Sequence, residues 1–311
     1  MSFTLFPDTR AALAADSLAG LSVGDALGAQ FFIPGQSLDA PPAPPWPWTD
    51  DTEEACCIVD ALKATAAEVE QAAGEDKSGA GEGKPGGGFD RDLFARLLGE
   101  RFDPYRGYGP GAVVMLRQIR EGSPWPIAAA AAFDGQGSAG NGAAMRAAPL
   151  GAWHADSLVR AAEQGARAAE VTHAHAEGIA GGVATTVAAA VAAAARLDGR
   201  PVDLLGAVLA HTPPSRVSDA LREARRITTA AEAAHELGNG SRSLAVDSVP
   251  FAIWVAARHL HDYPAAVQVC IAAGGDMDTT AAMAAGIVAA YTGIAGIPDE
   301  WLQAREPLPQ W

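Results

Sequence analysis

Two short segments that lie far apart in the chain concentrate oxygen ligands at the start of apolar helical stretches. The first is Trp48-Thr49-Asp50-Asp51-Thr52-Glu53-Glu54, and the second is Gly274-Gly275-Asp276-Met277-Asp278-Thr279-Thr280. A helix cap needs only one such side chain and first-turn acids suit the helix dipole, so capping is the commoner explanation. If the two segments meet in the fold, however, their aspartates concentrate negative charge that bound cations would offset. Hard oxygen ligands favour Mg²⁺, Mn²⁺ or Ca²⁺ over zinc.

The histidines form two weaker patterns. In His173-Ala174-His175 the two rings are two positions apart, so on a helix they point to different sides and do not chelate one ion, although His173 alone can line a pocket. The doublet His261-Asp262 is similar to the one in helical metal phosphohydrolases, which need further ligands on other helices, and a lone doublet is usually at the surface. No G-x-S-x-G motif and no evident nucleophilic cysteine is present. More residues therefore support a metal site built from oxygen ligands than support any other candidate site.

A glycine-rich stretch between residues 133 and 142 is the second candidate for ligand binding. It contains a G-x-G-x-x-G pattern at Gly135, Gly137 and Gly140, but an Ala-rich helical run precedes it where a dinucleotide-binding fold requires a strand. Glycines and Asn141 ahead of a helical run free backbone N–H groups that can approach a phosphate. A plain connecting loop explains the same residues equally well.

The elements that must position these residues are predicted to be helices. The hydrophobic fraction is 49% and is carried largely by alanine, which favours close-packed helices, and no stretch alternates convincingly as a strand does. We therefore predict an all-α fold. The expected helices cover, approximately, residues 9–29, 51–70, 90–101, 112–121, a short run ending at 133, 143–148, 155–171, 178–196, 202–209, 216–236, 248–260, 265–273 and 279–292.

The chain is expected to form a single compact domain over residues 1–311, because the two acidic segments lie near opposite ends and can pair only within one unit. Gly20, Gly24 and Gly28 mark a helix face that a neighbouring helix can approach closely. Six prolines between residues 33 and 47 predict an extended loop that leads into the first acidic segment. Residues 72–88 are rich in Gly, Lys, Glu, Asp and Ser, and we expect a flexible surface excursion there.

Charge and cysteine usage limit the class of protein. A formal net charge of −15 argues against nucleic acid as the main partner, although it leaves room for an anionic ligand held by a metal and backbone amides. Cys56, Cys57 and Cys270 show no C-x-x-C spacing and are expected to be reduced core residues of a cytoplasmic protein. We expect no secretory signal, and the uncharged run 178–195 is too weakly hydrophobic for a membrane span, so it is expected to be a buried helix.

Motifs spread over almost the whole chain resemble those of the ADP-ribosylglycohydrolases, the family of the dinitrogenase-reductase-activating glycohydrolase and its animal relatives. In order, they are Gly24-Asp25-Ala26-Leu27-Gly28-Ala29, Trp48-Thr49-Asp50-Asp51-Thr52, Arg106-Gly107-Tyr108-Gly109, Gly140-Asn141-Gly142-Ala143-Ala144-Met145-Arg146, Thr172-His173 and Gly275-Asp276-Met277-Asp278-Thr279. Each motif is modest alone, but their order and spacing are specific. The resemblance implies an orthogonal all-α domain with two metal ions, usually Mg²⁺ or Mn²⁺, at the base of a cleft.

Matched position by position, the resemblance also implies roles for individual residues. The metal ligands would be Thr49, Asp50, Asp51, Asp276, Asp278 and Thr279. The residues that wrap the diphosphate and ribose, or line the pocket beside them, would be Phe133, Gly137, Ser138, Ala139, Gly140, Asn141 and His173. These loop motifs are most similar to the branch that acts on serine-linked ADP-ribose, poly(ADP-ribose) and O-acetyl-ADP-ribose.

Three positions depart from the pattern of that branch. Phe32 stands where the branch has a catalytic Glu, and Ala139 stands where it has an aromatic residue in the diphosphate loop. Met277, where Thr is usual, lies between two ligands and should matter less.

The missing carboxyl at position 32 affects the expected chemistry. Cleavage at ribose C1″ needs help for the leaving group and an activated water, and a metal can supply the second by lowering the pKa of the water. Proton transfer would then fall to Asp50, Asp51 or Asp278, or to a water. Arginine-linked ADP-ribose, whose leaving group is itself basic, becomes a candidate substrate beside the serine and acetyl linkages.

The expected function is that of a hydrolase, dependent on two Mg²⁺ or Mn²⁺ ions, that releases ADP-ribose from modified protein side chains or small ADP-ribosyl conjugates. We expect it to act as a monomer without a membrane partner. The alternative is a protein of the same fold that binds ADP-ribose without turnover, which Phe32 and Ala139 would explain. A helical metal phosphohydrolase is the third hypothesis and depends only on His261-Asp262 and generic acids.

Overall fold

The computed structural model describes residues 4–37, 40–75 and 88–311, and for residues 71–75 it describes the backbone only. Within these ranges only isolated β-bridges occur and no strand forms, so the predicted all-α class is confirmed. The helical elements are α1 (Pro7–Gln30), α2 (Asp50–Glu75), α3 (Arg91–Arg101), α4 (Pro110–Arg120), α5 (Trp125–Gly135), α6 (Gly142–Met145), α7 (Ala148–Trp153), α8 (Leu158–Glu170), α9 (Ala176–Asp198), α10 (Leu204–His211), α11 (Arg216–Ala224), α12 (Ala230–Glu236), α13 (Ala245–Arg258), α14 (Tyr263–Ala272), α15 (Met277–Thr292), η1 (Ile294–Gly296) and α16 (Asp299–Ala304).

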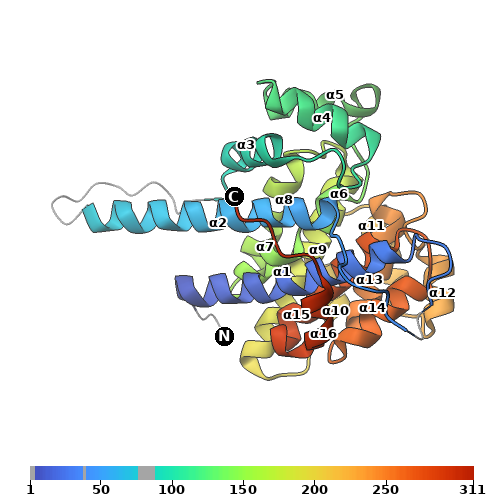
Figure 1. Ribbon diagram of the computed structural model, residues 1–311. Helices are drawn as coiled ribbons and strands as arrows, with labels where there is room; N and C mark the ends of the chain where they lie inside the picture. The colour runs from blue at the N-terminus through green and yellow to red at the C-terminus, as the bar shows by residue number, and fades with distance from the viewer. Residues whose placement is uncertain (1–3, 38–39, 76–87) are drawn as a thin grey trace.

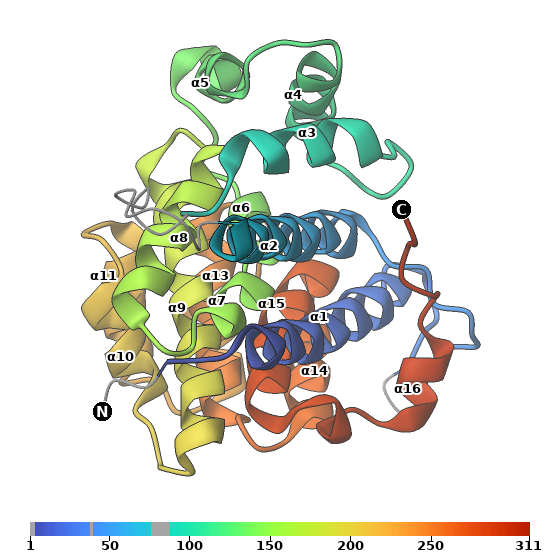
Figure 2. The ribbon, with the colours of Figure 1, turned by 90° about the vertical axis from the view of Figure 1, so that its left-hand side faces the viewer.

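The first and fifteenth helices pack against each other along the glycine face of α1 (Figures 1 and 2). A Cβ atom at Gly24 would lie 2.6 Å from the carbonyl oxygen of Ala281, and one at Gly28 would lie 2.6 Å from that of Met277. Any larger side chain would push the two backbones apart. Because Asp25 lies between these two glycines, the close approach carries its carboxylate to the N-terminal end of α15.

The ninth helix runs through the core and packs against α7, α8 and α15. It is long and apolar enough to cross a membrane by length and composition, but 89% of its apolar window is buried inside the fold. Its buried face consists mainly of Ala, Gly, Val and Thr, which allow neighbouring helices to lie close. Its burial is that of a core helix, as the sequence predicted.

The proline-rich loop before α2 is fixed by the C-terminal segment of the chain. The backbone N–H of Trp46 donates to the carbonyl of Ala304 at 2.7 Å, and that of Glu306 donates to the carbonyl of Trp46 at 2.9 Å. The indole of Trp48 donates to the carbonyl of Pro307 at 3.1 Å. Both indoles are buried. These contacts fix the position of the chain where it enters α2.

A separate layer of α3, α4 and α5 lies above α2 (Figures 1 and 2). Phe94, Leu98 and Phe102 of this layer join the smaller of the two main apolar clusters, together with Ile58 of α2. The path of α5 breaks near its end, where Phe133 and its neighbour have left-handed backbone angles. This break turns the chain from α5 toward the interior.

The helix boundaries differ from the predicted ones at several places. The predicted helix 216–236 is two helices, because the Thr229 side chain accepts from the backbone N–H of Glu232 and caps a new helix there. The predicted helix 155–171 begins at Leu158, where Ser157 caps it, and α7 precedes it. Helix α2 continues to Glu75, into the segment expected to be flexible. The rest of that segment, residues 76–87, lies outside the described residues.

Candidate active site

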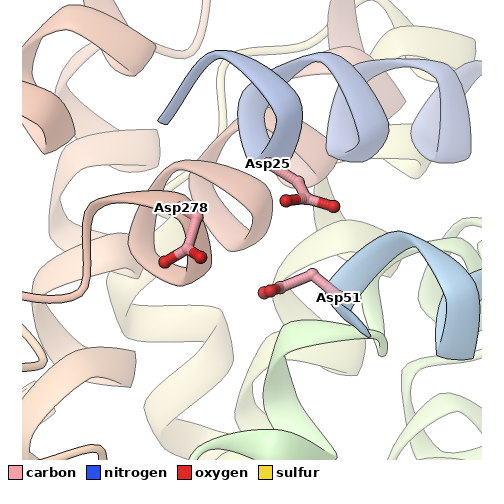
Figure 3. Close-up of side chains that lie close together, drawn as sticks. All are labelled: Asp25, Asp51 and Asp278. Atoms are coloured by element: carbon pink, nitrogen blue, oxygen red, sulfur yellow. The ribbon is translucent and has the colours of Figure 1, made fainter. Parts of the chain in front are cut away.

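Three carboxylates from three helices converge beside the start of α2. Asp25 of α1, Asp51 of α2 and Asp278 of α15 each place an oxygen within 4.8 Å of the others. Figure 3 shows their side chains pointing toward a common space. The two acidic segments thus lie side by side, brought together by the close packing of α1 on α15.

Asp25 holds the first acidic segment in place. Its carboxylate accepts hydrogen bonds from the backbone N–H groups of Thr49 and Thr52, at 2.9 and 3.1 Å, and from the hydroxyl groups of the same two residues. The backbone N–H of Asp50 donates to the carbonyl of Arg106 at 2.7 Å. These bonds satisfy the N–H groups of Asp50 and Thr52 in the first turn of α2, and Asp25 does so from a neighbouring helix.

Asp51 lacks the donors that a buried carboxylate needs. It is 1% exposed, and its Oδ1 atom has no hydrogen-bond partner. Thr49 Oγ1 lies 2.9 Å from Asp51 Oδ2, but its single proton is already donated to Asp25 Oδ1, at 2.7 Å. In the described part of the chain no Lys or Arg forms an ion pair with Asp25, Asp51 or Asp278. A divalent cation fits this set, since it would satisfy the orphaned oxygen and offset the charge.

The electrostatics of the cluster show the same need for positive charge. Burial, followed by repulsion from Asp25 and Asp278, raises the pKa of Asp51 well above its ordinary value. Burial, followed by repulsion from Asp276 and Asp25, likewise raises the pKa of Asp278 well above its ordinary value. Burial, followed by repulsion from Glu54, raises the pKa of Asp50 in the same way. The cluster is therefore poorly suited to hold all its negative charges without a cation.

Asp276 is held by two Gly-Asn-Gly sequences, residues 140–142 and 238–240. The side-chain amide of Asn141 donates to Asp276 Oδ2 at 2.7 Å, and the backbone N–H of Asp276 donates to the carbonyl of Asn239 at 3.0 Å. A Cβ atom at Gly240 would lie 2.4 Å from the Cβ of Asp276, and Gly240 has a φ of +86°. Only glycine fits there without moving the aspartate.

A cavity of about 360 Å³ opens above the carboxylates. Asp50, Asp276, Asp278 and Thr279 form part of its lining, whereas Thr49 and Asp51 do not line it. The opposite wall consists of apolar residues of α4, among them Met115 and Leu116. The cavity therefore has an acidic base and an apolar side.

Five of the residues predicted to bind substrate line this cavity. They are Phe133, Ser138, Gly140, Asn141 and His173. Phe133 is 63% exposed and has a φ of +51°, which costs a non-glycine residue about 1–2 kcal/mol.

Gly137 and Ala139, which were also predicted to bind substrate, do not line the cavity. Gly137 packs against the backbone of His175, and the carbonyl of Ala139 accepts from the backbone N–H of Ala245 at 3.0 Å.

Four other residues discussed for the sequence do not line the cavity, namely Phe32, His175, His261 and Asp262. Phe32 lies in the turn after α1, is half exposed and does not line the cavity. His175 caps α9 by accepting from the backbone N–H of Glu177, so it does not form a metal pair with His173. Asp262 caps α14, and His261 packs edge-on against Tyr291, so this doublet is not a ligand pair.

Sequence reasoning assigned no role to three parts of the site. Asp25 lies within the motif Gly24–Ala29, and its position between Gly24 and Gly28, on the closely packed helix face, could have indicated its role. The second Gly-Asn-Gly, at 238–240, repeats the first and was visible in the sequence. Ser243 lines the cavity with a φ of +51°, for which no sequence signal existed.

Comparison with known proteins agrees with this geometry. A family model described as ADP-ribosylglycohydrolase matches residues 7–311. ADP-ribosylhydrolase ARH3 of Bos taurus is 29% identical over 93% of this chain and 87% of its own length, and ARH3 of Homo sapiens is 29% identical over 93% and 88%. A solved structure described as an ADP-ribosylglycohydrolase-related protein complex has a TM-score of 0.62 at 24% identity, over 96% of this chain and 94% of its own. Because the family match spans nearly the whole chain, the protein belongs to the ADP-ribosylglycohydrolase family.

Proposed function

We propose that the protein is a metal-dependent hydrolase that releases ADP-ribose from modified protein side chains or small ADP-ribosyl conjugates. The observation that carries the proposal is the convergence of the two acidic segments beneath a cavity lined by the predicted diphosphate and ribose loop. Family membership and the ARH3 relatives support the activity. We further propose that the ions are two Mg²⁺ or Mn²⁺, because the available ligands are all oxygens.

The proposed reaction replaces the bond between ribose C1″ and the side-chain atom with a bond to a water oxygen. Divalent ions held by Thr49, Asp50, Asp51, Asp276, Asp278 and Thr279 would orient the sugar hydroxyls and make a water more acidic. Asp50 and Asp278 reach the cavity surface, so either carboxylate can accept the proton of the attacking water. Asp51 lies behind them and would act on the reaction through the ions. The departing side-chain atom takes up the proton that the carboxylate accepted, directly or through a water, so atoms balance. A basic arginine guanidine takes up this proton more readily than a serine oxygen.

The test is to incubate the full-length protein with arginine-, serine- and acetyl-linked ADP-ribosyl substrates, in Mg²⁺, in Mn²⁺ and in chelator. We expect release of free ADP-ribose from at least one linkage with either metal and none with chelator. Asp262→Asn is the control for Asp278→Asn, because Asp262 also lies at the start of a helix but outside the cavity. Turnover of none of the three linkages would contradict the proposal.

A protein that binds ADP-ribose without turnover is the second candidate, since Phe32 supplies no carboxyl and Ala139 no aromatic ring. Calorimetry with ADP-ribose separates the two. Micromolar or tighter binding beside zero turnover would favour the binding protein, whereas turnover excludes it.

A further inference from the structure

A chain of buried polar groups runs along the cavity lining, from Glu54 near the start of α2 to His173. Arg146 is 1% exposed, its Nη1 atom donates to Glu54 Oε2 at 2.6 Å, and its Nη2 atom donates to the hydroxyl oxygen of Thr172 at 2.7 Å. That hydroxyl oxygen in turn lies 2.8 Å from Nδ1 of His173. The chain ends at the imidazole ring that lines the cavity.

The direction of the last hydrogen bond follows from the donors available. A guanidinium can only donate, so the bond from Arg146 uses a lone pair of the Thr172 oxygen. No other acceptor for the Thr172 hydroxyl proton exists among the described residues, and the residue is only 5% exposed. Leaving that proton unpaired would cost about 1–3 kcal/mol. The hydroxyl therefore donates to His173 Nδ1.

An imidazole that accepts at Nδ1 carries its proton on Nε2 when neutral. The ring is held neutral: burial, and then the nearby guanidinium of Arg146, lowers the pKa of His173 to about 3. A Cβ atom at Gly140 would lie 3.6 Å from Nε2 and one at Gly142 would lie 3.4 Å from it, so this edge of the ring faces the cavity loop. Within the described chain Nε2 has no hydrogen-bond partner.

We propose that Thr172 is a positioning residue that fixes His173 as a neutral donor, with its Nε2–H aimed at a diphosphate or ribose oxygen of the bound ligand. This inference rests on the proposed function, because the ligand is taken to be ADP-ribose. Arg146 sets the direction of the Thr172 hydroxyl, and the glycines at 140 and 142 leave room for the ring and for the acceptor oxygen.

The test combines ring NMR with calorimetry on the full-length protein. In ligand-free protein labelled with ¹⁵N-histidine, a His173→Gln variant identifies the ring signals, which should show a protonated Nε2 and an unprotonated Nδ1. Thr172→Val removes the hydroxyl while keeping the shape of the side chain. It should give a mixture of tautomers and weaken ADP-ribose binding by about 3- to 10-fold, the range expected for one neutral hydrogen bond. Thr172→Ser keeps the hydroxyl and should restore both readouts.

Thr212→Val is the matched control, because Thr212 is another buried threonine whose hydroxyl bonds a backbone carbonyl far from the cavity. A protonated Nδ1 in the wild-type ring, or a Thr172→Val variant that keeps both tautomer and affinity, would overturn the assignment. Failure of wild-type protein to bind ADP-ribose would contradict the proposed function, while the ligand-free tautomer would still test Thr172. ADP, which lacks the ribose that carries C1″, serves as a second ligand. An equal loss for ADP places the acceptor oxygen on the diphosphate or the adenosine ribose, and no loss places it on the ribose that carries C1″.

Discussion

The starts of α2 and α15 have similar acidic sequences but are held in place in different ways. At α2, the carboxylate of Asp25 reaches in from another helix and takes the N–H and hydroxyl groups of Thr49 and Thr52. At α15, two loops hold Asp276: the side-chain amide of Asn141 donates to its carboxylate, and the carbonyl of Asn239 accepts from its backbone N–H. A glycine at position 240 leaves room for its side chain.

The two helix starts of the candidate metal centre therefore depend on different interactions. One acidic segment is placed by charge and hydroxyl groups, which respond to pH and to bound cations. The other is placed by the shape of loops that require left-handed glycines. Variants at the two helix starts should therefore fail in different ways, although both should affect the same ions.

The largest effect is expected from removing one carboxylate from either acidic segment of the centre. Asp51→Asn and Asp278→Asn should each lower ADP-ribose release by about 1,000-fold or more, because the ions lose a charged ligand. In chelator each variant should be more stable than wild type by on the order of 1 kcal/mol, because a buried repulsion is gone. Activity assays and urea unfolding with and without Mg²⁺ measure both. If only one variant lost metal binding, the two segments would not share a centre.

The next largest effect is expected from a glycine substitution that tests the role of the loops beside α15. Gly240→Ala adds a Cβ that would lie 2.4 Å from Asp276, whereas Gly274→Ala has the same left-handed backbone demand but meets open space. Both should lose about 1–2 kcal/mol of stability from backbone strain. Only Gly240→Ala should also weaken Mn²⁺ binding, by about 10- to 100-fold as for other residues that orient ligands. Calorimetric Mn²⁺ titrations decide, and equal affinities in the two variants would contradict this role.

The pH dependence of stability in chelator tests the charge-based side of the comparison. Raised pKa values of Asp50, Asp51 and Asp278 mean that the native state binds more protons than the unfolded state above about pH 4. The free energy of unfolding contributed by these groups should therefore fall as pH rises, by at most about 1.4 kcal/mol per pH unit for each proton.

Urea unfolding of wild type and Asp51→Asn between pH 5 and 8 isolates this contribution, because the histidines contribute equally to both proteins. The variant should gain stability over wild type as pH rises. Saturating Mg²⁺ should abolish that gain, and a difference that shrinks with pH would have the wrong sign.

The smallest effect is expected at one hydroxyl that holds α2. Thr52→Val removes a donor to Asp25 while the backbone N–H bond remains, and should cost about 1–2 kcal/mol of stability with a several-fold loss of Mg²⁺ affinity. Thr65→Val on the same helix removes only a bond to the Ala61 carbonyl and should stay within about 0.5 kcal/mol. Thermal unfolding and Mg²⁺ titration compare them. Identical behaviour would show that Asp25 does not depend on this hydroxyl.

Much of the site could be predicted because short motifs show both the ligand-forming residue types and the positions where the backbone needs glycine. The oxygen ligands of the two acidic segments, the glycine face of α1 and the loop ahead of Gly142 were all visible as residue types at fixed spacings. Helix ends were predicted less well, because caps such as Ser157 and Thr229 compete with apolar runs that continue past them.

By itself the sequence determined the all-α class, the family resemblance and a supply of carboxylates at the starts of two distant helices. Only the tertiary structure decided that Asp25 completes the cluster, that Asp51 lies behind the cavity surface, and that Thr172 and Arg146 orient His173. The physical reason is that these contacts join residues distant in the chain. Their formation depends on how closely backbones approach and on which donors remain free after packing, and neither quantity is a property of a local segment.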